Sequence, residues 1–196
     1  MELKNIQLRQ FGKQFKLTRF LLIALIALLF TQIGCSANEN KKFNVFLEKF
    51  NLIELPIDLA SLDRDKAIST DDYALFLNLD SIEWQKKDEF YYFTIARFNL
   101  GEFIGLFFQR VYESKDSQNY KIENVLCVFD KKGNLLSSLI VGGSYLIEDS
   151  EVNISGDFKT DLTLKINRDE FFKEGDEKNE TEYYKINSNT GQIIKK

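Results

Sequence analysis

The sequence EFYYFTIARFNL at residues 89–100, followed by FIGLFFQRVYE at residues 103–113, decides the fold class of this chain. Both runs are rich in aromatic and β-branched residues, which pack well on the pleated surface of a sheet. Between them, NLGE at residues 99–102 provides the glycine of a tight turn. The segment therefore predicts a β-hairpin.

Apolar side chains occupy both faces of the second strand of this hairpin. Successive side chains of a strand point to opposite faces. Phe103 and Phe107 therefore face one way, and Leu106 and Phe108 face the other. Both faces must then be covered. A barrel, a sandwich, or a curved sheet with helices packed on one side would cover them.

Short strands and tight turns continue to the end of the chain. Asp130–Gly133 and Asn187–Gly191 both end in glycine, as turns that close with a left-handed residue do. No long helical segment separates the strands, which predicts a mainly β, antiparallel meander, with an α+β fold as the alternative. The further strand-like runs are residues 120–129, 135–141, 151–158, 161–167, 182–186 and 192–195.

Two short amphipathic segments before the strands predict helices. The first has apolar residues at the i, i+3, i+4 and i+7 spacing of one helix face, namely Phe43, Phe46, Leu47 and Phe50. The second, residues 68–77, begins with Ser69 as a capping residue and Asp72 three residues later, with Ile68 and Tyr73 placed as a hydrophobic staple. An acidic residue at this place is more typical of helix capping than of catalysis.

The first 35 residues have a different composition. An apolar run of 11 residues, Phe20–Phe30, is preceded by five basic residues and followed by TQIG and Cys35. A positive segment, an apolar run and a small residue before the cleavage point are typical of export signals. With the cysteine directly after Gly34, the segment resembles a bacterial lipoprotein signal peptide. The resemblance implies export, cleavage between Gly34 and Cys35, and attachment of long acyl chains such as palmitate to Cys35.

A membrane-spanning helix and a buried core helix are the alternatives for this apolar run. A spanning helix needs about 20 apolar residues, and an unbroken run with no polar face is unlike a core helix packed on one side. The predicted organisation is a signal peptide at residues 1–34, the lipidated Cys35 with a polar tether at residues 35–42, and a single globular domain at residues 43–196, with short helices at residues 43–78 and the meander at residues 82–196.

The lipoprotein resemblance also implies a location. In such proteins a serine after the lipid-bearing cysteine, here Ser36, favours the outer membrane where the cell has two membranes. The chain without its leader keeps 21 of the 26 basic and 29 of the 30 acidic residues, a net charge of −8. An acidic domain is a poor ligand for nucleic acid, which is bound through Lys and Arg. The expected partners are the membrane, through the lipid, and an envelope protein or glycan.

The residue types present exclude several chemistries. The chain has no histidine, the commonest general base and metal ligand, and no Ser-His or Cys-His nucleophile pair can form. With Cys35 acylated, Cys127 has no partner for a disulfide within the chain. Cys127 alternates with Val125 and Phe129, so a small buried apolar role is expected.

Two groups of residues are candidate binding sites. Carboxylates at Glu148, Asp149 and Glu151, and over residues 169–182, could hold Ca²⁺, but they lack the spacing of a calcium loop, and a solvated loop is the simpler expectation. Aromatic residues could stack on a sugar or peptide, although a half-buried place on a sheet face is equally typical. These residues are Trp84, Tyr91, Tyr92, Tyr183 and Tyr184.

From about Ile68 onward, ISTDD, FDKKGNLLSSL and INSNTGQII resemble the small β-meander domains of uncharacterised bacterial lipoproteins. That resemblance implies no activity. The sequence thus predicts a membrane-anchored, non-enzymatic binding or structural module, with no catalytic residue, metal or cofactor. A small envelope hydrolase that uses carboxylates, or an inhibitor or immunity-type lipoprotein, is the alternative.

Overall fold

The computed structural model describes residues 40–77, 90–113, 120–147, 150–173 and 175–196. Residues 43–196 form one compact unit, and the statements below concern its described part. Residues 40–42, which the sequence places in the tether, are helical. The predicted sites at Gly34, Cys35, Trp84, Glu148 and Asp149 lie outside the described residues, and so do the leader and residues 36–39.

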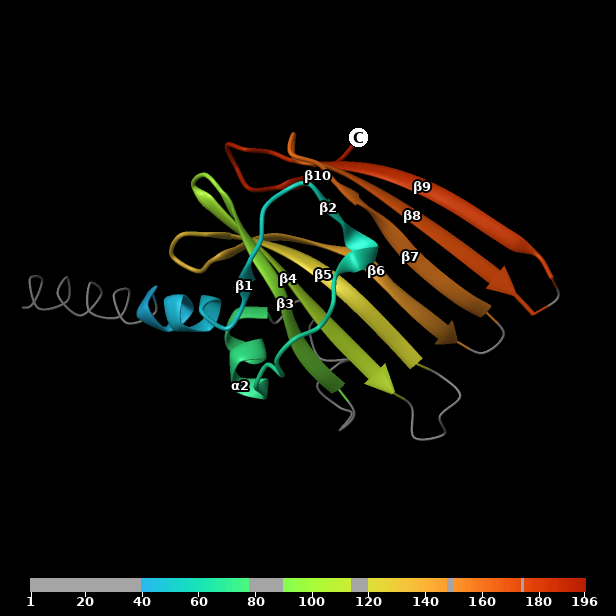
Figure 1. The fold of residues 1–196 in the computed structure, drawn as a ribbon, viewed down its shortest axis with the longest axis horizontal. Coiled ribbons are helices and arrows are strands. Elements are labelled where there is room, and N and C mark those ends of the chain that lie inside the picture. Colours follow the sequence, from blue (N-terminus) through green and yellow to red (C-terminus); the bar gives the residue numbers. More distant parts are fainter. Residues whose placement is uncertain (1–39, 78–89, 114–119, 148–149, 174) are drawn as a thin grey trace, which may run out of the picture. The chain divides into compact units, whose positions relative to one another are not determined.

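The unit is built on one ten-stranded sheet (Figure 1). The strand order is β1-β3-β4-β5-β6-β7-β8-β9-β10, with β2 paired to β7 beside this path. From β3 to β10 each strand pairs antiparallel with the next one along the chain, which confirms the mainly β meander. Because β1 and β10 stand at the two ends of the order, the sheet is open and not a closed barrel. The strands are β1 (Asn51–Leu52), β2 (Ile57–Asp58), β3 (Phe90–Leu100), β4 (Phe103–Glu113), β5 (Tyr120–Asp130), β6 (Leu135–Ile147), β7 (Ser150–Phe158), β8 (Thr163–Phe172), β9 (Glu177–Ile186) and β10 (Ile193–Lys195).

The predicted turns adopt the expected geometry. Gly133 has a φ of 91° and Gly191 a φ of 70°, a conformation that glycine adopts without steric cost. Asp130 closes its turn by accepting hydrogen bonds from the backbone of Lys132 and Asn134 at 2.8 and 2.9 Å. A side chain at position 133 would also meet the ring of Phe43, whose Cγ would lie 2.7 Å from its Cβ.

The acidic stretch at residues 169–182 is not the expected loop. It forms the end of β8 and the beginning of β9. The reason is that opposite charges stand in register across the two strands, with Arg168 facing Glu180 and Glu170 facing Lys178. Such cross-strand pairs of opposite charge stabilise a sheet. They do so in strands whose sequences lack the apolar–polar alternation from which a strand is predicted. Glu151 likewise lies within β7.

A segment that the sequence left without elements covers one face of the sheet. This strap, residues 51–67, contains β1 parallel to β3, β2 antiparallel to β7, and the short 3-10 turn η1 (Leu59–Ser61). It therefore spans from one end of the sheet to its middle (Figure 1). Its residues Leu59 and Leu62 are buried in the strap-side core, which also contains Ile95, Ala96, Phe98, Leu100, Phe107, Leu126, Val128, Val141, Phe158, Leu164, Ile166 and Ile186.

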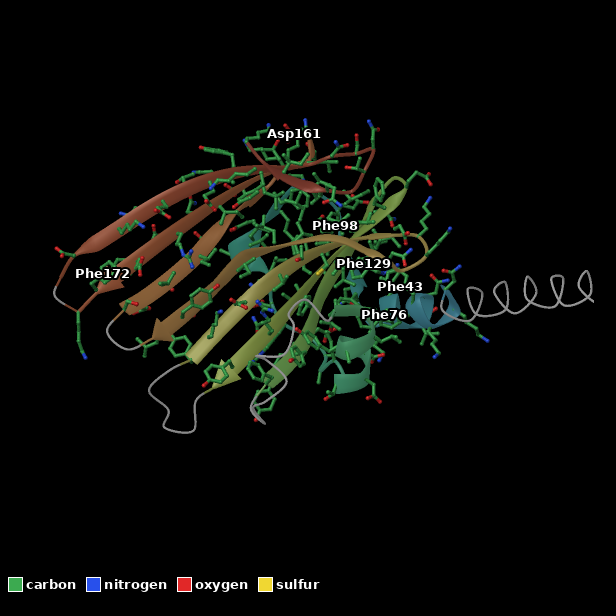
Figure 2. The ribbon with its side chains drawn as sticks, turned by 180° about the vertical axis from the view of Figure 1, so that it is seen from behind. Phe43, Phe76, Phe98, Phe129, Asp161 and Phe172 are labelled. Carbon is green, nitrogen blue, oxygen red and sulfur yellow. The ribbon has the colours of Figure 1, made fainter. Side chains whose placement is uncertain are left out.

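The other face is covered by the predicted N-terminal helices. Residues 43–47 are helical, and α2 (Thr70–Asp72) continues into a single π-helical turn, η2 (Tyr73–Leu77). Figure 2 shows Phe43, Phe76 and Phe129 together, with ring centroids 5.6 Å apart for Phe43–Phe76 and 5.2 Å for Phe43–Phe129. This helix-side core contains Phe43, Phe46, Leu47, Phe50, Ile68, Tyr73, Leu77, Leu106, Phe108, Val125, Cys127 and Phe129.

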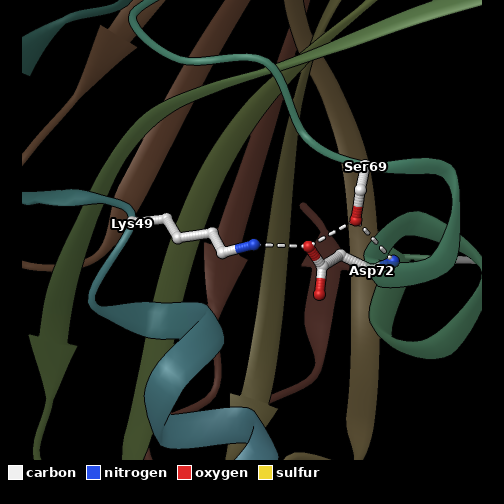
Figure 3. A network of polar contacts seen from close by, with 3 residues as sticks. All are labelled: Lys49, Ser69 and Asp72. Atoms are coloured by element: carbon white, nitrogen blue, oxygen red, sulfur yellow. Dashed lines mark hydrogen bonds and ion pairs between the residues drawn. The ribbon is translucent and has the colours of Figure 1, made fainter.

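The predicted cap at Ser69 is present, and it also joins the two helices (Figure 3). Ser69 Oγ accepts the Asp72 backbone N–H at 3.2 Å and donates to Asp72 Oδ2 at 2.6 Å. Lys49 Nζ, at the end of the first helix, lies 2.5 Å from the same oxygen. Partial burial opposes ionisation of Asp72, but the hydrogen bonds from Lys49 and Ser69 prevail and lower its pKa. Asp72 is thus a structural residue, as expected from its place in the helix.

Phe107 and Phe108 are adjacent in sequence but lie in different cores, one on each face of the sheet. Removing either side chain should therefore destabilise the domain. Phe107 and Phe108 are both fully buried. We expect Phe107→Ala and Phe108→Ala each to lower the free energy of unfolding by about 3–5 kcal/mol, measured by urea denaturation. Tyr91→Ala, at a side chain that is 52% exposed, is the control and should cost no more than about 0.5 kcal/mol. A large loss for only one phenylalanine would contradict a sheet covered on both faces.

Candidate functional site

A groove opens where the strap leaves the edge of the sheet. Its volume is about 530 Å³. Three segments far apart in sequence line it: residues 52–55 of the strap, residues 98–100 at the end of β3, and Thr160 with Leu162 in the turn between β7 and β8. Six of its nine lining residues are apolar, and Glu54, Asn99 and Thr160 are polar, but polar atoms form the larger part of the surface that the groove exposes. This mixture is typical of sites that bind organic ligands or peptides.

The strap forms one wall because it is bonded to the sheet on both sides of the groove. Ile53 donates its backbone N–H to the Arg97 carbonyl at 2.9 Å, and after this bond the strap leaves β3 until it returns at residue 65. The chain then passes a cis peptide bond at Leu55-Pro56. Two residues further, Ile57 pairs with Phe158 of β7. The strap thus crosses from β3 to β7 over residues 54–56, and the groove lies under this crossing.

The turn after β7 forms the opposite wall and contains a conformational outlier. Leu162 has a φ of 65°, and among the described residues it is the one residue other than glycine with a positive φ. A left-handed leucine costs about 1–2 kcal/mol, but here its side chain packs on the strap-side core. Asp161, labelled in Figure 2, holds the turn by accepting the Thr163 backbone N–H at 3.1 Å, which lowers the pKa of Asp161.

The floor of the groove is the strap-side core itself. Phe98 and Leu100 line the groove, yet both also belong to that core, and Phe98 is only 1% exposed. Its ring packs on Phe107 and Phe158 at centroid distances of 5.2 and 5.3 Å. An apolar group that entered the groove would therefore extend an existing packed core.

A second candidate is a buried group of charges at the middle of the sheet. Glu123 is 1% exposed and is the single buried carboxylate among the described residues. It forms an ion pair with Arg110 on the neighbouring strand, and Lys121 Nζ lies 2.9 Å from Glu123 Oε1. Burial, and then the negative charge of Glu123, raise the pKa of Tyr145. Lys121 also lies over the Tyr145 ring, 5.0 Å from its centroid.

Each oxygen of the buried Glu123 carboxylate lies beside a cation, Oε2 beside Arg110 and Oε1 beside Lys121, and such pairing is the usual condition for charges inside a protein. Glu123 has two cationic neighbours, and neither Glu123 nor Arg110 is accessible for a ligand to reach. The cluster therefore fits a structural role better than a binding role. The groove, whose residues are exposed to solvent on one side, is the stronger candidate site.

The candidate aromatic residues that the structure describes do not form one continuous surface patch. Tyr91 and Tyr183 are about half exposed, but they lie on β3 and β9, at opposite ends of the sheet. Tyr92 stacks on Tyr73 at 3.6 Å between centroids, and Tyr184 donates to Glu182 at 2.7 Å. Cys127 is fully buried, and this burial raises the pKa of its thiol. It is the small core residue that its strand position predicted.

Sequence reasoning identified neither the groove nor the buried charges. Arg110 and Glu123 are 13 positions apart and meet only through the register of β4 with β5. The groove draws its lining from three segments that the strap brings together. Arg110, which alternates with Phe108 and Tyr112 along one face of its strand, was the available signal for the first, and the isolated Pro56 was a weak one for the second.

Comparison of the chain with protein-family models, curated proteins and solved structures found no match. In the described part of the chain, three or more potential metal ligands do not come together. Over the same residues, none of the helices has the length and apolar character needed to cross a bilayer.

Removing the charge of Glu123 should destabilise the domain strongly. Glu123→Gln leaves the buried Arg110 facing a neutral amide, and loss of one member of a buried ion pair costs about 3–5 kcal/mol. The matched control is Glu182→Gln, which removes an exposed pair with Lys195 and should cost less than about 1 kcal/mol. Urea unfolding measures both. Equal, small losses would show that the buried cluster is not a structural element.

Proposed function

We propose that this protein is an exported lipoprotein whose sheet domain binds a protein, peptide or glycan of the cell envelope and catalyses no reaction. The groove carries the proposal for binding. It is concave, it offers polar surface between apolar side chains, and one of its walls is fixed to the sheet by backbone hydrogen bonds. Rigid sites of this kind bind ligands at a low cost in conformational entropy.

The composition of the groove favours binding over catalysis. Catalysis at neutral pH needs a group that takes or gives a proton. The chain has no histidine, and Glu54 is the one acidic residue of the lining. A glycosidase needs two carboxylates flanking the scissile bond. The groove supplies one, which favours binding over the hydrolase alternative.

The leader supports the anchor. Its basic segment, its 11-residue apolar run and the Gly34-Cys35 pair match an export signal that ends at a lipidated cysteine. Two or more acyl chains hold a protein stably at a bilayer. The globular part would then face its ligand from the membrane surface, which raises the local concentration of both.

Replacing Cys35 should abolish the anchor. We expect Cys35→Ala to appear in the soluble fraction or to remain unprocessed, because no acyl chain can be attached. Mass spectrometry of the wild-type protein should find Cys35 as an acylated N-terminus. Cys127→Ala is the control and should stay in the membrane fraction. An intact, unacylated chain from Met1 to Lys196 in the membrane would refute the lipoprotein proposal.

The purified full chain in mild detergent should retain an envelope partner and turn nothing over. We expect a protein or glycan from an envelope extract to remain bound, more weakly as salt rises if the net charge of −8 contributes. Peptidoglycan, glycan and peptide substrates should be recovered unchanged. Hydrolysis that disappears when one Asp or Glu is replaced would establish the hydrolase alternative. Retention of a single envelope enzyme, with loss of its activity, would establish the inhibitor alternative.

A further inference from the structure

The outer edge of β3 is nearly sealed by the strap. Three backbone bonds join strand and strap around Thr94: Asp65 N–H to the Thr94 carbonyl at 2.8 Å, Thr94 N–H to the Lys66 carbonyl at 2.7 Å, and Ile68 N–H to the Tyr92 carbonyl at 2.8 Å. Further along, the Arg97 carbonyl accepts from Ile53. An exposed strand edge is a template for pairing with another chain, and over these residues the template is occupied.

Asn99 is where this seal ends. In an antiparallel pair, alternate residues direct both their N–H and C=O groups to the same side. Arg97 directs its carbonyl away from β4 and toward the strap, and β3 has no register shift after Ala96. The backbone N–H and C=O of Asn99, two residues later, therefore also point away from β4. The strap has already left the strand at Ile53. Within the described residues, no backbone group of the chain pairs with this side of Asn99.

The groove begins beside these backbone groups. Asn99 is one of its lining residues, and Phe98 and Leu100 form its apolar floor. Leu55 and Leu162 stand on its two walls, and Glu54 places a carboxylate at the rim. One backbone donor and acceptor, a groove with apolar side chains in its lining, and an acidic residue therefore lie together.

We propose that the groove binds an extended peptide segment, which adds a short strand beside Asn99. The backbone of the peptide would pair with Asn99, a large apolar side chain would enter the groove, and a neighbouring Lys or Arg would face Glu54. Strand addition takes its affinity from main-chain bonds and its specificity from pockets for alternate side chains. The basic residue also suits the acidic charge of the whole domain. This inference rests on the proposed binding function and specifies its ligand.

The backbone pairing is tested by removing one donor at a time. The probe is an N-acetylated, fluorescein-labelled hexapeptide of alternating leucine and lysine, and its Kd for the full chain in mild detergent is measured by fluorescence anisotropy. Asn99→Pro removes the outward N–H without touching the bonds of Phe98 and Leu100 to β4, whereas Asn99→Ala keeps that N–H. We expect Asn99→Pro to weaken binding roughly tenfold more than Asn99→Ala does, because both variants lose the side chain and only the proline variant loses the N–H. Methylation of the central leucine nitrogens of the peptide should have an effect similar to Asn99→Pro.

The groove and the charge are tested by side-chain changes. Leu162→Gly relieves the left-handed strain but removes an apolar wall, and it should weaken binding roughly tenfold. Glu54→Gln should weaken binding of the lysine peptide and not of one with glutamine in place of lysine. Leu75→Ala, at an exposed leucine of η2, is the matched control and should bind as the wild type does. Urea unfolding of each variant separates loss of binding from loss of fold.

Each other outcome overturns the peptide inference in a defined way. Binding that falls with Leu162→Gly but ignores Asn99→Pro and N-methylation would mean an apolar ligand without strand pairing. A dimer in sedimentation that dissociates on Leu162→Gly would mean a second copy as occupant. If folded wild type binds no such peptide, yet the full chain and Leu162→Gly retain the envelope partner equally, the binding function stands at another surface. If neither peptide nor partner is retained, both proposals fail.

Discussion

The structure depends on the apolar character of both faces of the central strands. Along β4 and β5, residues of the strap-side core alternate with residues of the helix-side core, so that Phe107 and Leu126 lie on one side while Phe108 and Val125 lie on the other. If either face were in contact with water, a large apolar area would be exposed, at a free-energy cost of about 25 cal/mol for each Å². The sheet alone cannot cover itself, because it is open. The 35 residues before β3 that the structure describes in this unit supply both covers, a pair of helical segments for one face and the strap for the other.

The route of the strap follows from this double duty. It leaves the helical segment at residue 50, runs beside β3 for two residues, and must then reach β7 to cover the far half of the strap-side core. It returns to β3 at residues 65–68 and begins the second helical segment. The same crossing that covers the core leaves the end of β3 without a backbone partner, among the described residues, on the side away from β4. The groove is thus a geometric consequence of covering the core with one continuous segment, and its floor is core because the strap passes above it without filling it.

Local patterns predicted the parts of the fold that local patterns determine. The hairpin at residues 90–113, the glycine turns at Gly133 and Gly191, and the cap at Ser69 each depend on neighbours within a few positions, and each is present. β1 and β2 escaped prediction because a two-residue strand has no period, and its pairing partner is 45 or 101 residues away in the register. The hairpin at residues 169–182 was mistaken for a loop because its pattern is one of charge and not of hydrophobicity. The candidate site was out of reach for a further reason, since it is assembled from three distant segments and consists partly of backbone groups, which no residue type reveals.

The two ends of the sheet differ in a way that bears on function. β10 covers β9 only at Tyr184–Ile186, so that residues 177–182 form an outer edge. That edge carries Lys178, Glu180 and Glu182, paired among themselves or with Lys195, and charges on an edge discourage pairing with another chain. At the other end the strap covers β3 up to Asn99, which lines the groove together with Leu55, Leu100 and Leu162, and Glu54 is the single charged residue of that lining. Leu162 has a positive φ in the turn beside this groove, where glycine or asparagine would suit the backbone better. Packing on the core accounts for part of this choice of residue, and lining the groove would account for the rest. Charges on one edge, and outward backbone groups beside a groove on the other, are what a domain needs if it is to accept an added strand beside Asn99.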